Sequence, residues 1–257
     1  MFLIGLDKEK GERMTAWEIT KKSYKEIYQN IAAILTASIL WFLIAGIVIL
    51  ANFIALNAIL IGKPVWILPF LFLALLTVGP ATAGAFYVSN IVVRYGNLSI
   101  SDFFIGLKEY FFKSIFLTSA FALVAGILCF DFTFFLSSDT LWMKLSSLIW
   151  LSGLIFSSIV FIYSFTLMIE LDRLDESNSI KDIIKYSAVL SIKEFKFTLF
   201  IYLQILIYLV WSVGLVITLP TIFMGGISLI ANNATLNLLV KHNVIDDVSG
   251  PKTFKEQ

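Results

Sequence analysis

Residues 77–84 read TVGPATAG, and they lie inside an apolar run that extends from Val65 to Val93 without a charged side chain. An α-helix needs about 20 apolar residues to cross the hydrocarbon core of a bilayer, so this run is long enough to span a membrane. The stretch therefore decides the fold class, because it places a glycine–proline pair at the centre of a membrane helix.

The same eight residues predict a hinge that also serves as a packing site. Proline lacks a backbone donor and clashes with the preceding turn, so Pro80 predicts a kink or break. The Thr77 hydroxyl is expected to bond to the freed backbone. Small side chains let a neighbouring helix approach closely, and here they are Gly79, Ala81 and Gly84.

Five such charge-free runs, this one included, lie along the chain, which we interpret as a single integral membrane domain over residues 1–257. Hydrophobic residues make up 59% and charged residues 14%, whereas soluble domains carry about 25% charged residues. The last run, 197–240, is 44 residues long with Leu219-Pro220 as a natural break. Six spans are predicted, near 31–55, 66–93, 114–136, 145–169, 197–218 and 221–240; one bent helix over 197–240, giving five spans, is the alternative.

The basic residues predict the orientation. Of the 19 Lys and Arg, 17 lie before the first span, between spans two and three, between spans four and five, or after the last; Lys63 and Lys144 lie in the other loops. The positive-inside rule therefore predicts a cytoplasmic N-terminus (1–30) and C-terminal tail (241–257). These basic segments suit anionic lipid headgroups, and the net charge of +1 does not suggest a nucleic-acid partner.

The predicted cytoplasmic segments share a capping-box pattern, which marks the start of a helix. The three pairs are Thr15 with Glu18, Ser99 with Asp102, and Ser179 with Asp182. Apolar residues at helical spacing follow each pair, so we expect three amphipathic helices lying in the headgroup plane. The predicted fold is an all-α, six-transmembrane-helix bundle of three repeats, each a cytoplasmic amphipathic helix plus a transmembrane hairpin. The predicted apolar stripes are Trp17, Tyr24, Ile27 and Tyr28; Ile100, Phe103, Phe104, Leu107 and Phe111; and Ile180, Ile183, Ile184 and Ala188.

Polar residues at the mid-membrane depth of the predicted spans are few and uncharged. We expect them to join helices by hydrogen bonds; the alternative is a polar lining for a solute path. The candidates are Asn57, Asn90, Gln204, Asn233 and Asn237.

The remaining reactive residue types do not form a catalytic or metal-binding pattern. The acidic group Glu170, Asp172, Asp175 and Glu176 around Arg173 is interpreted as a solvated helix end rather than a metal or catalytic site. The single histidine, His242, is also expected in solvent, and the single cysteine, Cys129, is expected to be buried. No enzyme, metal or cofactor is therefore predicted.

The segments TVGPATAGAFYV (77–88) and SISDFFIGLKEYF (99–111) resemble the YesL-like family of bacterial integral membrane proteins. The family pattern is T-[IV]-G-[PA]-A-x-x-A followed by a cytoplasmic D-F-F helix. The matching residues are Thr77, Gly79, Pro80, Ala81, Asp102 and Phe103. Pro69 departs from the pattern because it stands eight residues before Thr77, where family members have a proline about three residues before.

The resemblance implies a role around carbohydrate import, because genes of that family often accompany oligosaccharide-uptake genes. No site residues are defined for the family. The chain also lacks a phosphate-binding loop of the GxxxxGK[ST] type. We therefore expect a non-enzymatic accessory or assembly protein of the bacterial plasma membrane, associated with subunits of a sugar ABC importer. The alternative is a stand-alone channel or carrier for a small neutral solute.

Overall fold

A computed structural model describes residues 14–60, 67–96, 99–174, 179–215 and 218–245. Within these ranges the chain forms helices and no strand. Lys63, Asp175 and Glu176 lie outside the described residues, as do residues 1–13 and most of the predicted tail, 246–257.

The helices follow one another with short connections. They are α2 (Ala16–Gln29), α3 (Ile31–Trp41), the π-helical turn η1 (Phe42–Gly46), α4 (Ile47–Leu60), α5 (Ile67–Tyr95), α6 (Ile100–Glu109), α7 (Phe111–Leu136), α8 (Leu141–Arg173), α9 (Ile180–Lys193), α10 (Phe195–Gly214), α11 (Thr218–Thr221) and α12 (Phe223–Lys241).

Six helical segments are long and apolar enough to cross a membrane, which agrees with the six predicted spans. They are Ile31–Ala58, Pro69–Tyr95, Phe111–Leu136, Leu141–Arg173, Phe195–Gly214 and Phe223–Lys241. The last two are separate helices, so the single bent helix considered for 197–240 is not found.

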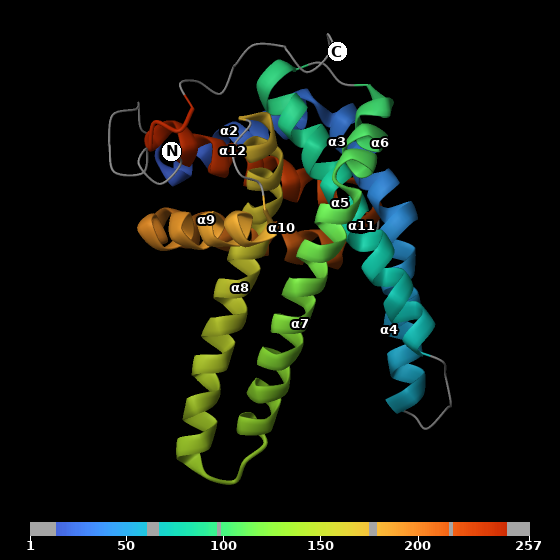
Figure 1. Cartoon of the computed structure of the whole chain (residues 1–257), viewed down its shortest axis with the longest axis vertical. Helices are drawn as coiled ribbons and strands as arrows, with labels where there is room; N and C mark the ends of the chain where they lie inside the picture. Colours follow the sequence, from blue (N-terminus) through green and yellow to red (C-terminus); the bar gives the residue numbers. More distant parts are fainter. Residues whose placement is uncertain (1–13, 61–66, 97–98, 175–178, 216–217, 246–257) are drawn as a thin grey trace.

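The spans differ greatly in how far the rest of the protein covers them. In the most apolar window of α12, 89% of the residues are buried, against 11% in α7 and 17% in α8. The central position of α12 explains this, because it packs against α2, α3, α5, α8 and α10. Figure 1 shows α7 and α8 as a long hairpin that extends away from the other helices, with α9 crossing near its base.

The three predicted short helices begin where their caps predict. The Thr15 amide donates to the Glu18 carboxylate at 2.7 Å, and the Ser99 amide donates to Asp102 at 2.8 Å. At the third start, the Asp182 amide donates to the Ser179 hydroxyl at 3.2 Å. The hydrogen bond from the Thr15 amide lowers the pKa of Glu18, as expected for a carboxylate that caps a helix.

The apolar stripes of these helices are not uniformly exposed, because part of each packs against the rest of the protein. On α2, Ile27 is buried, whereas Trp17 and Tyr28 are exposed. On α6, Phe103 is fully buried while Phe104 is exposed. A periodic stripe cannot distinguish protein from lipid as its apolar neighbour, and in these helices part of it packs against protein while the rest is exposed.

Candidate functional site

The most deeply buried charges form an ion pair between two spans. Arg94 is near the end of α5, Glu170 is near the end of α8, and neither side chain is exposed. Arg94 Nη2 lies 2.5 Å from Glu170 Oε2, and Arg94 Nε lies 3.2 Å from Oε1. Such bidentate contacts between a guanidinium and a carboxylate fix the relative orientation of the two side chains as well as pairing their charges. The pair therefore joins the ends of α5 and α8 in one defined orientation.

Asparagine side chains extend this pair to α12. Asn90 Nδ2 donates to Glu170 Oε1 at 2.7 Å and lies 3.4 Å from Asn232 Oδ1. Asn232 Nδ2 in turn donates to the Phe86 and Ser228 carbonyls. We call Arg94, Glu170, Asn90 and Asn232 the α5–α8–α12 network. The Glu170 carboxylate accepts hydrogen bonds from Asn90 Nδ2, Arg94 Nε and Arg94 Nη2. Most of its acceptor positions are therefore occupied by protein donors and not open to a ligand.

A second polar cluster ties another side of α12 to α2. Asn233 Nδ2 donates to Glu26 Oε2 at 2.6 Å and to Ser23 Oγ at 3.2 Å. One turn later, Asn237 donates to the Met14 carbonyl at 3.4 Å. These bonds hold the N-terminal helix against the central one.

Two further charge contacts lie at helix ends. Glu194, between α9 and α10, contacts Lys241 Nζ and also His242 Nε2, the latter at 3.1 Å. Lys113, at the start of α7, pairs with Asp172 of α8 at 2.9 Å. Each contact joins segments that are far apart in sequence.

The five residues proposed as a polar lining lie in separate places. Asn57 is exposed and donates to its own helix at the Phe53 carbonyl. Asn90 belongs to the α5–α8–α12 network, and Asn233 and Asn237 bond to the N-terminal segment. Gln204 is half-buried on α10. Two of the five, Asn90 and Asn233, make interhelical hydrogen bonds, and Asn237 bonds to the residue Met14 before α2. No continuous polar path runs among the five.

The TVGPATAG segment is a site of close helix packing. A Cβ added to Gly79 would lie 2.6 Å from the Ser114 carbonyl oxygen of α7. A Cβ added to Gly84 would lie 2.8 Å from the Phe103 carbonyl oxygen of α6. Pro80 and Ala81 are buried between these contacts. The two glycines therefore let α5 touch the backbones of two other helices.

The break that Pro80 could cause does not occur. The α5 helix continues through Pro80 from Ile67 to Tyr95, so it does not break. The Thr77 hydroxyl donates to the Leu73 carbonyl at 2.9 Å, not to the Leu76 carbonyl that the proline leaves without its helical donor. Packing on both sides of Pro80 holds the chain in helical form despite the missing bond.

Several environments predicted from sequence are wrong. Glu170 is fully buried rather than solvated, and it pairs with Arg94 rather than Arg173. His242 is 4% exposed because it packs beside Glu194. Cys129 is exposed on α7 rather than buried. Local sequence placed each residue relative to a span, but the burial depends on helices elsewhere in the chain.

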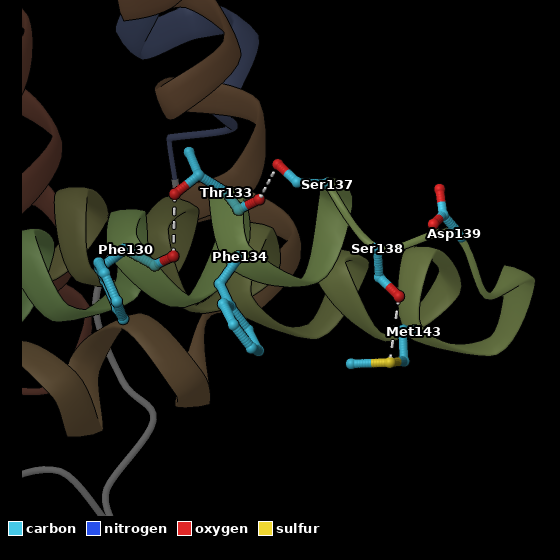
Figure 2. A pocket seen from close by; sticks show the side chains of 7 residues that line it. All are labelled: Phe130, Thr133, Phe134, Ser137, Ser138, Asp139 and Met143. Atoms are coloured by element: carbon cyan, nitrogen blue, oxygen red, sulfur yellow. Dashed lines mark hydrogen bonds between the residues drawn. The ribbon is translucent and has the colours of Figure 1, made fainter.

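An open depression of about 540 Å³ lies at the turn between α7 and α8, far along the hairpin from the α5–α8–α12 network (Figure 2). Its hydroxyls donate within the hairpin: Thr133 to the Phe130 carbonyl, Ser137 to the Thr133 carbonyl and Ser138 to Met143 Sδ. These hydrogen bonds stabilise the end of α7 and the turn into α8, so the side chains of this depression have a structural role.

Among the described residues, no three His, Cys, Asp or Glu side chains gather as a metal site requires. The chain matches no protein-family model, no curated protein sequence and no solved structure. The site is therefore defined by its own geometry, which is a closed set of hydrogen bonds around one buried ion pair.

Glu109, the last residue of α6, gives a pH-dependent prediction. Although the Glu109 side chain is exposed at the surface, the protein around it displaces part of its water, and this partial desolvation together with the negative charge of Asp172 raises the pKa of Glu109 above its ordinary value. A raised folded-state pKa means that the group supports folding fully at acidic pH, and that this support is lost as the pH rises through the folded pKa. Glu109→Gln is therefore expected to melt slightly above the wild type at neutral pH and at the same temperature below pH 4.5. Tryptophan-fluorescence melts in detergent measure both.

Asp139→Asn is the matched control, since it removes an exposed carboxylate from the hairpin turn. It should leave the difference between acidic and neutral pH unchanged. A Glu109→Gln protein whose melting temperature follows the wild type at every pH contradicts the repulsion between Glu109 and Asp172.

Proposed function

We propose that this protein is a non-enzymatic accessory or assembly factor of the bacterial plasma membrane, a YesL-like protein associated with ATP-driven carbohydrate uptake. The observation that carries the proposal is the closed α5–α8–α12 network. Its ion pair is fully buried and its carboxylate is bonded to the protein, so the charged groups act on the fold rather than on a substrate. A protein of this kind works through its surface.

The distribution of polar side chains supports this reading over a channel or carrier. A solute path needs polar groups that succeed one another across the membrane. Asn57 bonds to its own helix, while Asn90 and Asn233 bond on different sides of α12. The same separation gives α12 a bracing role, because it connects spans that would otherwise share few polar contacts.

The proposed organisation repeats one unit three times, an amphipathic helix followed by a transmembrane hairpin, with both termini in the cytoplasm. Two observations support it: α2, α6 and α9 each begin at a Ser or Thr cap, and each leads directly into an apolar helix of membrane length. Reporter fusions at the C-terminus test the orientation. A fluorescent C-terminal fusion agrees with it, and an active periplasmic-phosphatase fusion contradicts it.

The outer face of α2 suits anionic lipid headgroups. We define this face by its exposed aromatic and basic side chains, Trp17, Lys21, Tyr24, Lys25 and Tyr28. Lys21 Nζ lies 5.2 Å from the centre of the Trp17 ring, which is cation–π distance. Aromatic rings and lysines in alternation are typical of a segment at the membrane interface.

Cross-linking in native membranes tests the proposed partner. We expect an affinity-tagged chain, cross-linked before solubilisation, to carry importer permease and ATPase subunits that mass spectrometry identifies. A tagged, unrelated six-span protein expressed at the same level is the control. Repeated recovery of the chain without any importer subunit contradicts the association with uptake. Saturable solute flux into vesicles holding the chain alone supports the carrier instead.

A further inference from the structure

The described helices pack in a cyclic order. Each short helix lies against the second span of the preceding proposed repeat, counting the third repeat as the one before the first: α2 on α12, α6 on α5 and α9 on α8. The second spans α5, α8 and α12 also pack against one another. These contacts support the proposed organisation in three units, so equivalent surfaces of the three units can be compared.

The comparison concerns the surfaces that join one repeat to the next. We call a seam the surface where the first span of a repeat faces the second span of the preceding repeat, which gives α3 with α12, α7 with α5, and α10 with α8. Two seams are tight, because α3 packs along α12 and α7 packs along α5. The third seam differs, since α10 does not lie close along α8.

The two tight seams are built in the same way. A Cβ added to Gly225 of α12 would lie 2.6 Å from the Ile34 carbonyl oxygen of α3. A Cβ added to Gly79 of α5 would lie 2.6 Å from the Ser114 carbonyl oxygen of α7. Both carbonyls belong to the fourth residue of their span. Such close approach is a main source of helix association in a bilayer, where no hydrophobic force drives two apolar helices together.

The third seam has phenol rings where the others have glycine. The fourth residue of α10 is Thr198, and its hydroxyl accepts a hydrogen bond from Tyr163 Oη of α8 at 3.4 Å. One turn further along α10, Tyr202 Oη lies 2.7 Å from Ser158 Oγ of α8. The tyrosine side chains hold the two backbones apart, so this seam lacks the backbone contact of the other two. The remaining side chains that line it are isoleucines, Ile159 and Ile162 from α8 with Ile201 and Ile205 from α10.

Both helices of the third seam are anchored at the same end. Glu194, the residue before α10, pairs with Lys241 at the end of α12. Near the end of α8, Glu170 belongs to the α5–α8–α12 network. Because α8 and α10 run in opposite directions, both anchors lie at the end of the seam marked by Thr198 and Tyr163. The other end is held by side-chain contacts alone.

We infer that the seam between α8 and α10 is where this protein opens. In the opened form, α10 swings away from α8 at the end distant from Glu194, and the anchored end serves as the hinge. The movement separates Tyr202 from Ser158, while the two glycine seams stay closed. An accessory protein built in this way has two shapes, one with the seam closed and one with its hydroxyls uncovered. The inference rests on the proposed organisation in three units and uses no partner or solute.

Distances between spin labels test the opening. In a Cys129→Ser background, Ile155→Cys with Ile207→Cys places one label on α8 and one on α10, beyond the bond between the two hydroxyls. Leu73→Cys with Leu123→Cys is the reference pair across the tight seam of α5 and α7. All four positions are exposed, so the labels do not enter the core. Pulsed electron paramagnetic resonance in lipid nanodiscs is expected to give one narrow distance for the reference pair and two distances for the α8–α10 pair.

Tyr202→Phe links the second distance to the seam. The substitution keeps the ring of a half-buried residue and removes only the hydroxyl, so the fold is expected to persist. The ratio of the longer to the shorter distance should rise about threefold, which is the scale of one interhelical hydrogen bond in a membrane. Tyr28→Phe is the matched control, because Tyr28 is exposed on α2, and it should leave the ratio unchanged.

Three results overturn the inference. The first is a single narrow distance for both label pairs. The second is two distances for both pairs, which means that the whole bundle is loose rather than one seam. The third is an unchanged ratio in Tyr202→Phe, because the hydroxyl then does not close the seam. The C-terminal fusions and the cross-linking of importer subunits test the proposed function separately, so the failure of one is distinguishable from the failure of the other.

Discussion

Glu170→Gln is expected to destabilise the protein by about 3–5 kcal/mol, because it leaves Arg94 charged and buried without its partner. The substitution keeps the size of the side chain and removes only its charge. Arg94 and Glu170 are both fully buried, so water cannot replace the missing interaction. Chemical unfolding in detergent, followed by tryptophan fluorescence, measures the change in the free energy of unfolding.

Two controls separate the buried pair from charge loss in general. Asp172→Asn removes a charge two residues away in the same helix, from a pair with Lys113 whose side chains are 36% and 27% exposed. Exposed pairs contribute about 0–1 kcal/mol, so this variant should unfold close to the wild type. The double variant Arg94→Met with Glu170→Leu should recover stability relative to Glu170→Gln, because it leaves no unpaired charge. Equal stability of Glu170→Gln and the wild type contradicts a structural role for the pair.

Gly84→Leu is expected to destabilise the protein by at least about 1–3 kcal/mol, the usual range for overpacking a filled interior. The contact that forbids the larger residue is the Phe103 backbone carbonyl, 2.8 Å from the position of an added Cβ. A side chain could turn away, but α6 would have to move as a unit. We expect reduced yield of folded protein from membranes and a lower melting temperature.

Gly214→Leu is the matched control, since a Cβ at that exposed position of α10 meets nothing within 4 Å. It should express and melt like the wild type. Pro80→Leu tests the other half of the motif. Because α5 is already helical through Pro80, this variant is expected to keep the fold unless the larger side chain crowds the buried position. A Gly84→Leu protein that folds normally shows that the motif does not govern packing.

The sequence predicted the helices well because their signals are local. Charge-free segments of membrane length located the six spans, and the caps Thr15, Ser99 and Ser179 located the starts of α2, α6 and α9. Both signals depend on residues within one or two turns of each other. The glycines of TVGPATAG likewise predicted close packing, since only small side chains allow it.

The candidate site was less accessible from the sequence. Arg94 and Glu170 are 76 residues apart, and each stands at the edge of a span, where solvent exposure is the ordinary expectation for a charge. The one available signal was that the two apolar runs end next to charges of opposite sign, the first at Arg94 and the second at Glu170. Without the arrangement of the helices, this signal does not indicate whether the two charges meet.

The sequence by itself determined that this is an all-helical chain with six membrane-length helices and three capped amphipathic ones, because hydropathy and capping act over a few residues. Tertiary structure alone decided which faces are covered. It placed α12 at the centre, joined Glu170 to Arg94, and left Cys129 at the surface. Apolar side chains suit protein and lipid equally, so only the positions of the other helices determine which of the two they meet.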